Sequence, residues 1–282
     1  QNAKPGTLLA TNTSSLSIGK IAESTKRPQD VIGIHFFNPA YLMKLIEIIP
    51  GAKTSDQSQE RATNFVSSLN RKIGIVAKDS PGFIFNRILV PMMNEAFFLL
   101  DQFPQNAIEI DAAVKKHNIL PMGPFELADL IGLDIIYSVS QVIYEGLDRD
   151  PAYGPPPKLK EYVDNERFGI KNARGVYDYQ KNELGNPVVV YKRELATGFG
   201  LDGKSIFAVC INESLKVLET KVAKSREDIN RAIQIGGSWS KGPFDLIEIF
   251  GADAIRRTLS QYFESSKGQA RYLACSALKN EK

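Results

Sequence analysis

The sequence repeats itself, and this repeat constrains the fold more than any other feature. Residues 122–132 read Met-Gly-Pro-Phe-Glu-Leu-Ala-Asp-Leu-Ile-Gly, and residues 241–251 read Lys-Gly-Pro-Phe-Asp-Leu-Ile-Glu-Ile-Phe-Gly. In each copy, glycine permits a tight turn, proline suits the first position of a helix, and phenylalanine anchors that helix. Asn94-Glu95-Ala96 and Asn212-Glu213-Ser214 precede the two copies at nearly the same offset. The repeat therefore predicts two copies of one helical unit.

The regions around both copies read as all-α. Over residues 80–182, a helix opened by Pro81-Gly82 runs to Leu100 and is apolar on nearly all sides, which indicates burial or a dimer interface. Further helices are expected over 107–116, 124–130 and 135–147. We expect a linker over 183–204, at the end of a stretch rich in proline and glycine. The second helical unit is expected over 205–282.

Residues 1–79 instead alternate between strand and helix signals. Strands are predicted for the short apolar runs at 7–11, 31–36, 44–49 and 73–77. Helices are predicted behind Ser17 and over 55–69. Such alternation indicates an α/β layer with a mostly parallel sheet. A doubly wound domain needs more strands than these, so we expect only the C-terminal half of one. The predicted fold class is α/β followed by all-α.

Composition excludes several classes of function. The formal charge is +3, from 35 basic and 32 acidic residues, which is too balanced to indicate nucleic-acid binding. No apolar run approaches the ~20 residues that a membrane span requires. Cys210 and Cys275 lie in apolar helical patterns without a CxxC partner. We therefore expect reduced thiols, no metal site and an intracellular, cytoplasmic location.

One histidine and one glutamate are the first candidates for chemistry. His35 ends an apolar strand, and open α/β sheets bind ligands beyond the carboxyl ends of their strands. A lone histidine in such a place is more often structural. Glu47 changes this interpretation, because it interrupts an apolar strand where a carboxylate is costly unless it is paired. If the two strands are neighbours, Glu47 orients the His35 ring and raises its basicity, as for a general base.

Two further polar side chains stand where a ligand could bind. Ser14 follows a strand end; Ser15 or Ser17 can cap the next helix, which would leave Ser14 free to bond a ligand oxygen. Asn86 lies inside the apolar helix, where an amide needs a partner; a structural bond to the backbone is the alternative. His117, the second of two histidines, is expected at the surface.

These residues lie in motifs whose order resembles the 3-hydroxyacyl-CoA dehydrogenase family. The motifs are Asn-Thr-Ser-Ser-Leu, Gly-x-His-Phe-Phe-Asn-Pro, Met-Lys-Leu-Ile-Glu, Asp-Ser-Pro-Gly-Phe-Ile-x-Asn-Arg and Met-Gly-Pro-Phe-Glu-Leu, all within residues 6–180. Each motif alone is weak, but five in order are specific. The doubled helical unit is similar to family members with two C-terminal repeats. Several of those members are fused to an enoyl-CoA hydratase domain.

The resemblance implies oxidation of (S)-3-hydroxyacyl-CoA to 3-oxoacyl-CoA with NAD, in fatty-acid β-oxidation or related acyl-CoA metabolism. His35 would remove the proton of the 3-hydroxyl, and Glu47 would stabilise the resulting imidazolium. Ser14 and Asn86 would bond the hydroxyl or the 3-oxo oxygen. The positions that the resemblance implies at the cofactor are Asn38, Ser14 and Lys171.

The resemblance also implies the identity of each domain. Residues 1–79 would be the C-terminal part of a Rossmann-type NAD-binding domain, and the helical units would resemble the C-terminal domain of 6-phosphogluconate dehydrogenase. The family's Gly-rich phosphate loop belongs to strands that precede Gln1, so we expect this chain alone to bind little or no NAD. Residues 198–203 spell G-x-G-x-x-G. We interpret them as a decoy, because no strand follows the next helix as a βαβ site requires.

Alternatives remain at this point. Aligning the two copies places Lys204 opposite Asn86, so we expect the second unit to be structural. Two units in one chain could also satisfy internally a contact that otherwise joins two chains. A non-catalytic helical module that binds acyl-CoA or mediates oligomerisation is a different class of function. Another β-hydroxyacid dehydrogenase is disfavoured, because such enzymes usually use a lysine in place of His35.

Overall fold

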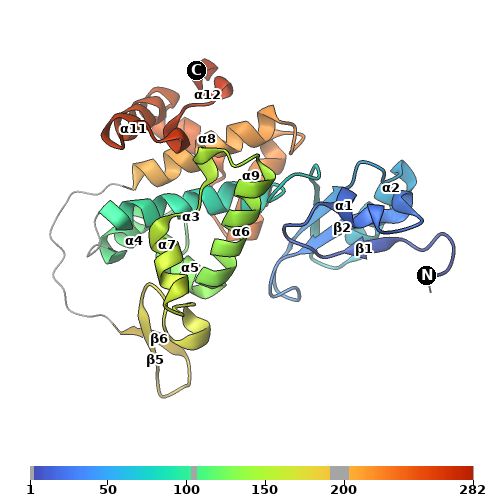
Figure 1. The fold of residues 1–282 in the computed structure, drawn as a ribbon, viewed down its shortest axis with the longest axis horizontal. Coiled ribbons are helices and arrows are strands. Elements are labelled where there is room, and N and C mark those ends of the chain that lie inside the picture. The colour runs from blue at the N-terminus through green and yellow to red at the C-terminus, as the bar shows by residue number, and fades with distance from the viewer. Residues whose placement is uncertain (1–2, 103–106, 191–202, 282) are drawn as a thin grey trace.

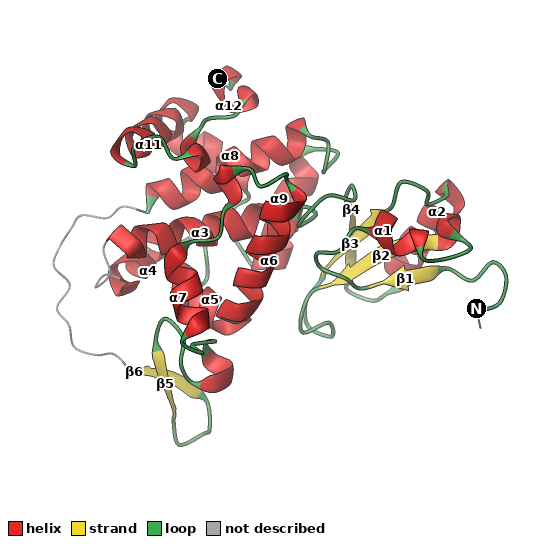
Figure 2. Cartoon of the chain, in the orientation of Figure 1, coloured by secondary structure: helices red, strands yellow, loops and turns green. Residues whose placement is uncertain are grey.

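A computed structural model describes residues 3–102, 107–190 and 203–281 of the chain. An α/β part that carries the N-terminus projects from a larger helical part (Figure 1). Strands gather in the first part, and the only strands described in the second form a small hairpin (Figure 2). One cluster of buried apolar residues runs from the sheet through both helical units, and a second cluster covers the other face of the sheet.

The described α/β part holds a four-stranded sheet in the order β1-β2-β3-β4. The elements are β1 (Leu9–Thr11), α1 (Ile18–Glu23), η1 (Pro28–Asp30), β2 (Val31–Phe36), β3 (Leu45–Pro50), α2 (Asp56–Ser68) and β4 (Ile73–Val76). The outer pairs β1–β2 and β3–β4 are parallel, as predicted, but β2 and β3 are antiparallel. The connection over residues 37–44 is too short for the crossover that a parallel pair needs, so the chain turns back on itself.

The helical part has the two units that the repeat predicts. The first comprises α3 (Phe85–Gln102), α4 (Ala107–Lys115), α5 (Pro124–Ile131), α6 (Leu133–Gly146), η2 (Pro151–Tyr153), α7 (Pro157–Asp164) and η3 (Ile170–Asn172), followed by β5 (Asp178–Lys181) and β6 (Pro187–Val190). The second comprises α8 (Lys204–Glu219), α9 (Arg226–Gly237), α10 (Pro243–Phe250), α11 (Ala252–Ser265), η4 (Ala270–Tyr272) and α12 (Ser276–Asn280). The units pack together through α3 and α8, which lie side by side in the middle of the molecule (Figure 1).

Three details differ from the sequence prediction. Helix α3 begins at Phe85 and not at Pro81, because Gly82 and Phe83 both have positive φ and form a turn ahead of it. Helix α7 lies in the stretch rich in proline and glycine; Pro157 starts that helix, since proline suits a first turn. Strand β6 occupies part of the predicted linker 183–204. Residues 198–202 of the G-x-G-x-x-G string lie outside the described residues.

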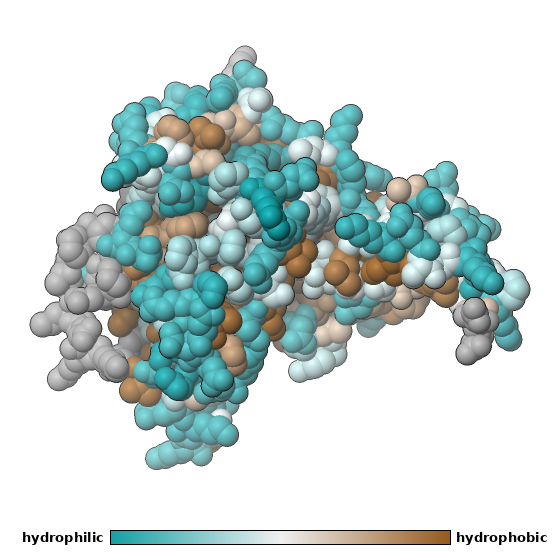
Figure 3. Space-filling model, viewed as in Figure 1, coloured by the Kyte–Doolittle hydropathy of each residue, from teal (hydrophilic) through white to brown (hydrophobic). Residues whose placement is uncertain are grey.

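The face shown in Figure 3 is mostly hydrophilic, with hydrophobic side chains in scattered patches. Within the described ranges, no single helix is long and apolar enough to span a membrane. Helices α5 and α6 meet that criterion only as a pair, and they are bent by 95° at the break between them. Cys210 is buried, Cys275 is half-buried, and neither forms a disulfide. Burial raises the pKa of both thiols.

Candidate active site

The structure places His35 and Glu47 directly opposite each other on the neighbouring strands β2 and β3. His35 Nδ1 lies 2.8 Å from Glu47 Oε2. Both side chains are buried, with 6% of His35 and none of Glu47 exposed to solvent. Residues paired across an antiparallel ladder project from the same face of the sheet, so the strand register brings these two side chains together. The expected contact is confirmed.

The second oxygen of Glu47 holds the start of the long helix. Glu47 Oε1 accepts hydrogen bonds from the backbone amides of Ile84 and Phe85, at 2.9 and 3.0 Å. These amides lie at the N-terminus of α3, where unpaired N–H groups favour a carboxylate. A carboxylate can only accept hydrogen bonds, so a neutral His35 ring bound to it carries its hydrogen on Nδ1 and leaves Nε2 as an acceptor. The contact with Glu47 therefore favours one tautomer of the His35 ring, with Nε2 facing away from the carboxylate.

Aromatic side chains surround the histidine ring. The Phe37 ring centroid lies 4.6 Å from that of His35, and the Phe83 centroid lies 5.8 Å away. Phe37 in turn packs edge-on against Phe85 at 4.9 Å. Phe83 and Phe85 are buried, which limits the access of water to the His35–Glu47 pair. Limited access of water strengthens the electrostatic interaction between them.

Ser14 lies in the loop that follows β1, which is the parallel neighbour of β2. This loop therefore leaves the sheet at the same edge as His35. Ser17 caps α1 by accepting from the amide of Lys20 at 3.3 Å, so Ser14 is not needed as a cap. Asn12, in the same loop, accepts a hydrogen bond from the amide of Phe36 at 2.8 Å. The Asn12 side chain thus ties the Ser14 loop to the strand that carries His35.

Asn86 lies in the first turn of α3, directly after the amides that Glu47 holds. It is half-buried. Among the described residues, no hydrogen bond is found for the side chain of Asn86 or of Ser14, so the backbone bond considered for Asn86 is not formed. A histidine, the carboxylate that it contacts and two available polar groups therefore come from β2, β3, the loop after β1 and the start of α3.

The two remaining predicted residues differ in position. Asn38 is exposed just beyond β2, ahead of a cis Asn38–Pro39 peptide, at the same edge as His35. Lys171 lies in η3 of the first helical unit. Its ammonium pairs with Asp134 at 2.5 Å and lies over the Phe168 ring. The structure therefore places Lys171 in contact with Asp134 and does not bring it to His35 and Glu47.

His117 is not the surface residue that the sequence suggested. It is half-buried between the rings of Phe207 and Phe250, with centroid distances of 5.3 and 5.5 Å. Both contacts are nearly perpendicular, which is a favourable arrangement for aromatic rings. His117 therefore contributes to the contact between the two helical units, because these phenylalanines belong to the second unit.

Two buried ionic clusters between the units were not predicted from the sequence. Glu213 of α8 accepts from Arg87 of α3 at 2.6 Å and from the Tyr153 hydroxyl at 2.9 Å. Glu95 of α3 accepts from the Tyr272 hydroxyl at 2.9 Å and from an arginine at 3.1 Å. A signal for them exists: Arg87 and Glu95 are charged positions in an otherwise apolar helix, as Glu47 is in its strand.

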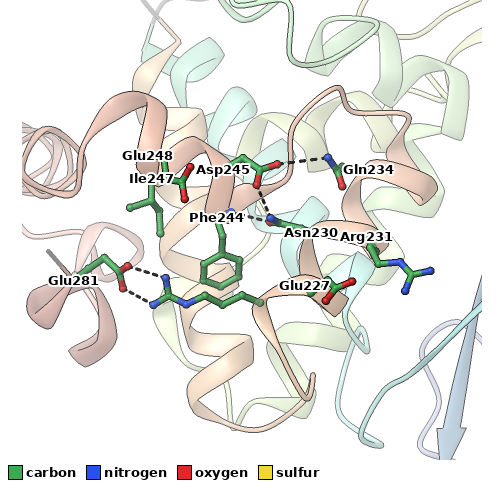
Figure 4. A pocket seen from close by; sticks show the side chains of 10 residues that line it. Glu227, Asn230, Arg231, Gln234, Phe244, Asp245, Ile247, Glu248 and Glu281 are labelled. Carbon is green, nitrogen blue, oxygen red and sulfur yellow. Dashed lines mark hydrogen bonds and ion pairs between the residues drawn. The ribbon is translucent and has the colours of Figure 1, made fainter.

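A pocket of about 670 Å³ lies on the second helical unit, away from His35. It is lined by side chains of α9 and α10 and by Glu281 (Figure 4). Glu281 pairs with Arg226, another lining residue, at 2.7 Å. Asn230 and Asp245 bond each other inside it at 2.8 Å. None of His35, Glu47, Ser14 and Asn86 lines this pocket, so we do not interpret it as the active site.

The fold and site define a class of two-part protein, in which a histidine–carboxylate pair lies near the ends of two central strands and faces a helical domain. Residues 1–80 match the sequence model described as 3-hydroxyacyl-CoA dehydrogenase, NAD binding domain. Residues 82–179 match the one described as 3-hydroxyacyl-CoA dehydrogenase, C-terminal domain. The chain belongs to the 3-hydroxyacyl-CoA dehydrogenase family.

Individual relatives extend this result. A protein of Bradyrhizobium diazoefficiens named 3-hydroxybutyryl-CoA dehydrogenase is 48% identical over 63% of this chain and 60% of its own length. The fatty acid oxidation complex subunit alpha of Vibrio cholerae is 34% identical over 98% of this chain and 39% of its own. The crystal structure of 3-hydroxybutyryl-CoA dehydrogenase from Escherichia coli K12 has a TM-score of 0.82 at 27% identity, over 98% of this chain and 75% of that one. The chain spans about three fifths of the Bradyrhizobium relative that it matches.

Proposed function

We propose that this chain carries the catalytic residues of an NAD-dependent dehydrogenase that oxidises (S)-3-hydroxyacyl-CoA to 3-oxoacyl-CoA. The observation that carries the proposal is the buried pair in which Glu47 Oε2 lies 2.8 Å from His35 Nδ1 at the edge of the sheet. Oxidation of a secondary alcohol needs a base for the hydroxyl proton, groups that hold the oxygen and a hydride acceptor. The chain supplies the first two requirements.

His35 Nε2 accepts the proton of the 3-hydroxyl, and the charge that forms on the ring is stabilised by the Glu47 carboxylate. That carboxylate stays fixed, because its other oxygen is held by two amides of α3. Ser14 and Asn86 bond the oxygen of carbon 3, first as hydroxyl and then as carbonyl. The Phe37 and Phe83 rings limit the access of water to the imidazole.

Bound NAD would supply the acceptor for the hydride that leaves carbon 3. The residues present fit such a cofactor: Ser14 and Asn38 follow the carboxyl ends of β1 and β2, where open α/β sheets bind nucleotides. Lys171 belongs to this proposal less directly, since it would have to exchange its partner Asp134 for the cofactor. The loop between β1 and α1 contains no glycine to cradle a phosphate. We therefore expect the 282-residue chain alone to bind NAD weakly.

The cellular setting is part of the same proposal. The Vibrio cholerae relative is named as a subunit of a fatty acid oxidation complex, which supports a role in β-oxidation with a fused or associated enoyl-CoA hydratase. Two unpaired cysteines suit a reducing compartment such as the cytoplasm. Contact between the helical units inside one chain supports internal pairing in place of a dimer through residues 81–180.

The test fuses the nucleotide-binding half of a relative ahead of Gln1 and follows NADH oxidation with acetoacetyl-CoA. We expect His35→Ala to lower kcat by roughly 10²–10⁴, the usual contribution of a general base. His117→Ala is the matched control: it removes the other histidine, which lies at the contact between the units, and should keep turnover. A folded chimera that binds NADH but turns over nothing would favour a non-catalytic module that binds acyl-CoA or mediates assembly.

A further inference from the structure

We propose that the second helical unit positions Asn86, through a buried contact from Glu213 to Arg87 and Tyr153. The first unit carries Asn86, but the second unit holds the helical turn on which Asn86 lies. The inference deepens the proposed function, since it assigns to the repeat a task at the site where Asn86 bonds the substrate oxygen. It makes Glu213 a positioning residue for the reaction and not a residue that touches substrate.

The turn that carries Asn86 is a short backbone segment that needs fixing at both ends. Gly82 and Phe83 have φ of +79° and +50°, so the chain enters α3 through a tight turn. On the sheet side, Glu47 holds the amides of Ile84 and Phe85. Asn86 follows these residues directly, and a change in the direction of the first turn of α3 would move its carboxamide.

The second unit holds Arg87, the residue that directly follows Asn86. Arg87 Nε lies 2.6 Å from Glu213 Oε1, and Arg87 Nη2 lies 2.9 Å from the Tyr153 hydroxyl. That hydroxyl also donates to Glu213, and the Arg87 guanidinium stacks 4.5 Å from the centre of the tyrosine ring. All three side chains are buried, so each has its charge or hydroxyl satisfied by the others. Arg87 cannot reorient without losing its ion pair with Glu213, which is also held by the Tyr153 hydroxyl and, at 3.4 Å, by Lys216 of α8.

Two more contacts from the second unit converge on the same place. A Cβ added to Gly236 of α9 would lie 2.7 Å from both Phe85 Cε2 and Leu45 Cδ2, so the α9 backbone packs directly against the start of α3 and the start of β3. The amide of Lys78 donates to the carbonyl of Val222 at 2.9 Å. The second unit therefore contacts the chain both before and after the turn that leads to Asn86.

The pseudo-symmetry of the units provides a matched control. Glu95 corresponds to Glu213 in the repeat and makes the equivalent contact in the opposite direction, with the hydroxyl of Tyr272 and the guanidinium of Arg271. It is equally buried. It lies further along α3, beyond the first turn that carries Asn86. Loss of either glutamate weakens the same interface, but only loss of Glu213 loosens the turn.

The first experiment uses the 282-residue chain and measures amide hydrogen exchange at Ile84 and Phe85, the amides that Glu47 holds. We expect Glu213→Gln to speed this exchange about tenfold or more, and Glu95→Gln to leave it unchanged, at equal loss of thermal stability. Equal acceleration by both variants, or by neither, overturns the inference. If Glu213→Gln does not fold, the comparison of Tyr153→Phe with Tyr272→Phe replaces the comparison of Glu213→Gln with Glu95→Gln. This readout needs no cofactor, so it does not depend on the proposed reaction.

The second experiment measures kcat and KM in the chimera with a complete nucleotide-binding half. Glu213→Gln should lower kcat about tenfold with little change in KM, because misplacing the group that holds the reacting oxygen affects the chemical step. The effect should disappear when Asn86→Ala is already present, while Glu95→Gln leaves kcat unchanged. An equal loss of kcat from Glu213→Gln in the presence of Asn86 and in the Asn86→Ala variant overturns the inference. If the wild-type chimera has no turnover, the proposed function fails and the exchange result still stands.

Discussion

The two helical units have the same plan but differ in what covers them. In the first, a Cβ added to Gly123 would lie 2.3 Å from Asp111 Cγ; in the second, a Cβ added to Gly242 would lie 2.3 Å from Asn230 Cγ. The repeat therefore preserves a close packing of the GPF turn against the preceding helix. The units differ in whether a later segment of the chain covers this packing.

In the first unit, residues 167–181 fold back over α4 and α5. Asp129 accepts from the amides of Val176 and Tyr177 and from the Tyr179 hydroxyl, at 2.8–2.9 Å. The Tyr177 hydroxyl donates to Asp111 at 2.8 Å. In the second unit, the corresponding side chains are Glu248, which is exposed, and Asn230, and both line the pocket of Figure 4. In the first unit, residues 167–181 thus cover a surface whose counterpart in the second unit lines an open pocket.

The largest expected effect breaks this closure. Asp129→Ala removes the acceptor of two amides and one hydroxyl at a buried site, which leaves these donors unsatisfied. We expect a loss of about 3 kcal/mol or more in the free energy of unfolding, from denaturant titration. Glu248→Ala, at the matching position of the second unit, should change the unfolding midpoint little. Equal losses from both would mean that the two units are closed alike.

A second prediction concerns pH. Burial raises the pKa of Asp111 to about 7 in the folded protein, from an ordinary value of 3.8. Between about pH 4 and pH 7 the folded state keeps a proton that the unfolded state releases. Stability that Asp111 contributes is therefore complete below about pH 4 and is lost as the pH rises to about 7, at up to about 1.4 kcal/mol per pH unit.

Asp111→Asn makes the first unit resemble the second and should remove this pH dependence. The precedent is Asn230, whose Oδ1 accepts from the amide of Phe244 at 2.9 Å while its Nδ2 donates to Asp245 at 2.8 Å. We expect the variant to gain stability relative to wild type with every step from pH 4 to pH 7, in denaturant titrations at each pH. A parallel pair of stability curves would rule out Asp111 as the group that titrates.

The same comparison explains what could be predicted from the sequence. The GPF repeat predicted the two units, because glycine and proline at a helix start leave a recognisable local pattern. His35 and Glu47 were paired correctly, because a carboxylate inside an apolar strand needs a partner and few partners were available. Both inferences depend on residue types that suit few local environments, so their surroundings are constrained.

The missed features depend on contacts between residues distant in sequence. No helix was predicted at α7, and nothing local indicates that the chain beyond α7 folds over Asp129. The antiparallel pairing of β2 and β3 depends on the length of their connection, whereas the strand signals themselves carry no direction. Glu213 and Arg87 are 126 residues apart, and only the packing of α8 on α3 brings them together. The place of Lys171 at the cofactor stays a prediction from the resemblance, and the sequence did not indicate its contact with Asp134.

The smallest expected effect concerns the open pocket of the second unit. Arg226 pairs with Glu281 through two contacts of 2.8 and 2.7 Å and stacks over the Phe244 ring. Half of its side chain is exposed, so solvent screens the pair. Arg226→Ala should therefore cost less than about 1 kcal/mol, and the cost should shrink further in ~1 M salt, as thermal unfolding can show. A loss as large as that of Asp129→Ala, insensitive to salt, would mean that the Arg226–Glu281 pair closes the second unit as the folded-back segment closes the first. The difference between the units would then lie in which residues close each of them, and not in whether they are closed.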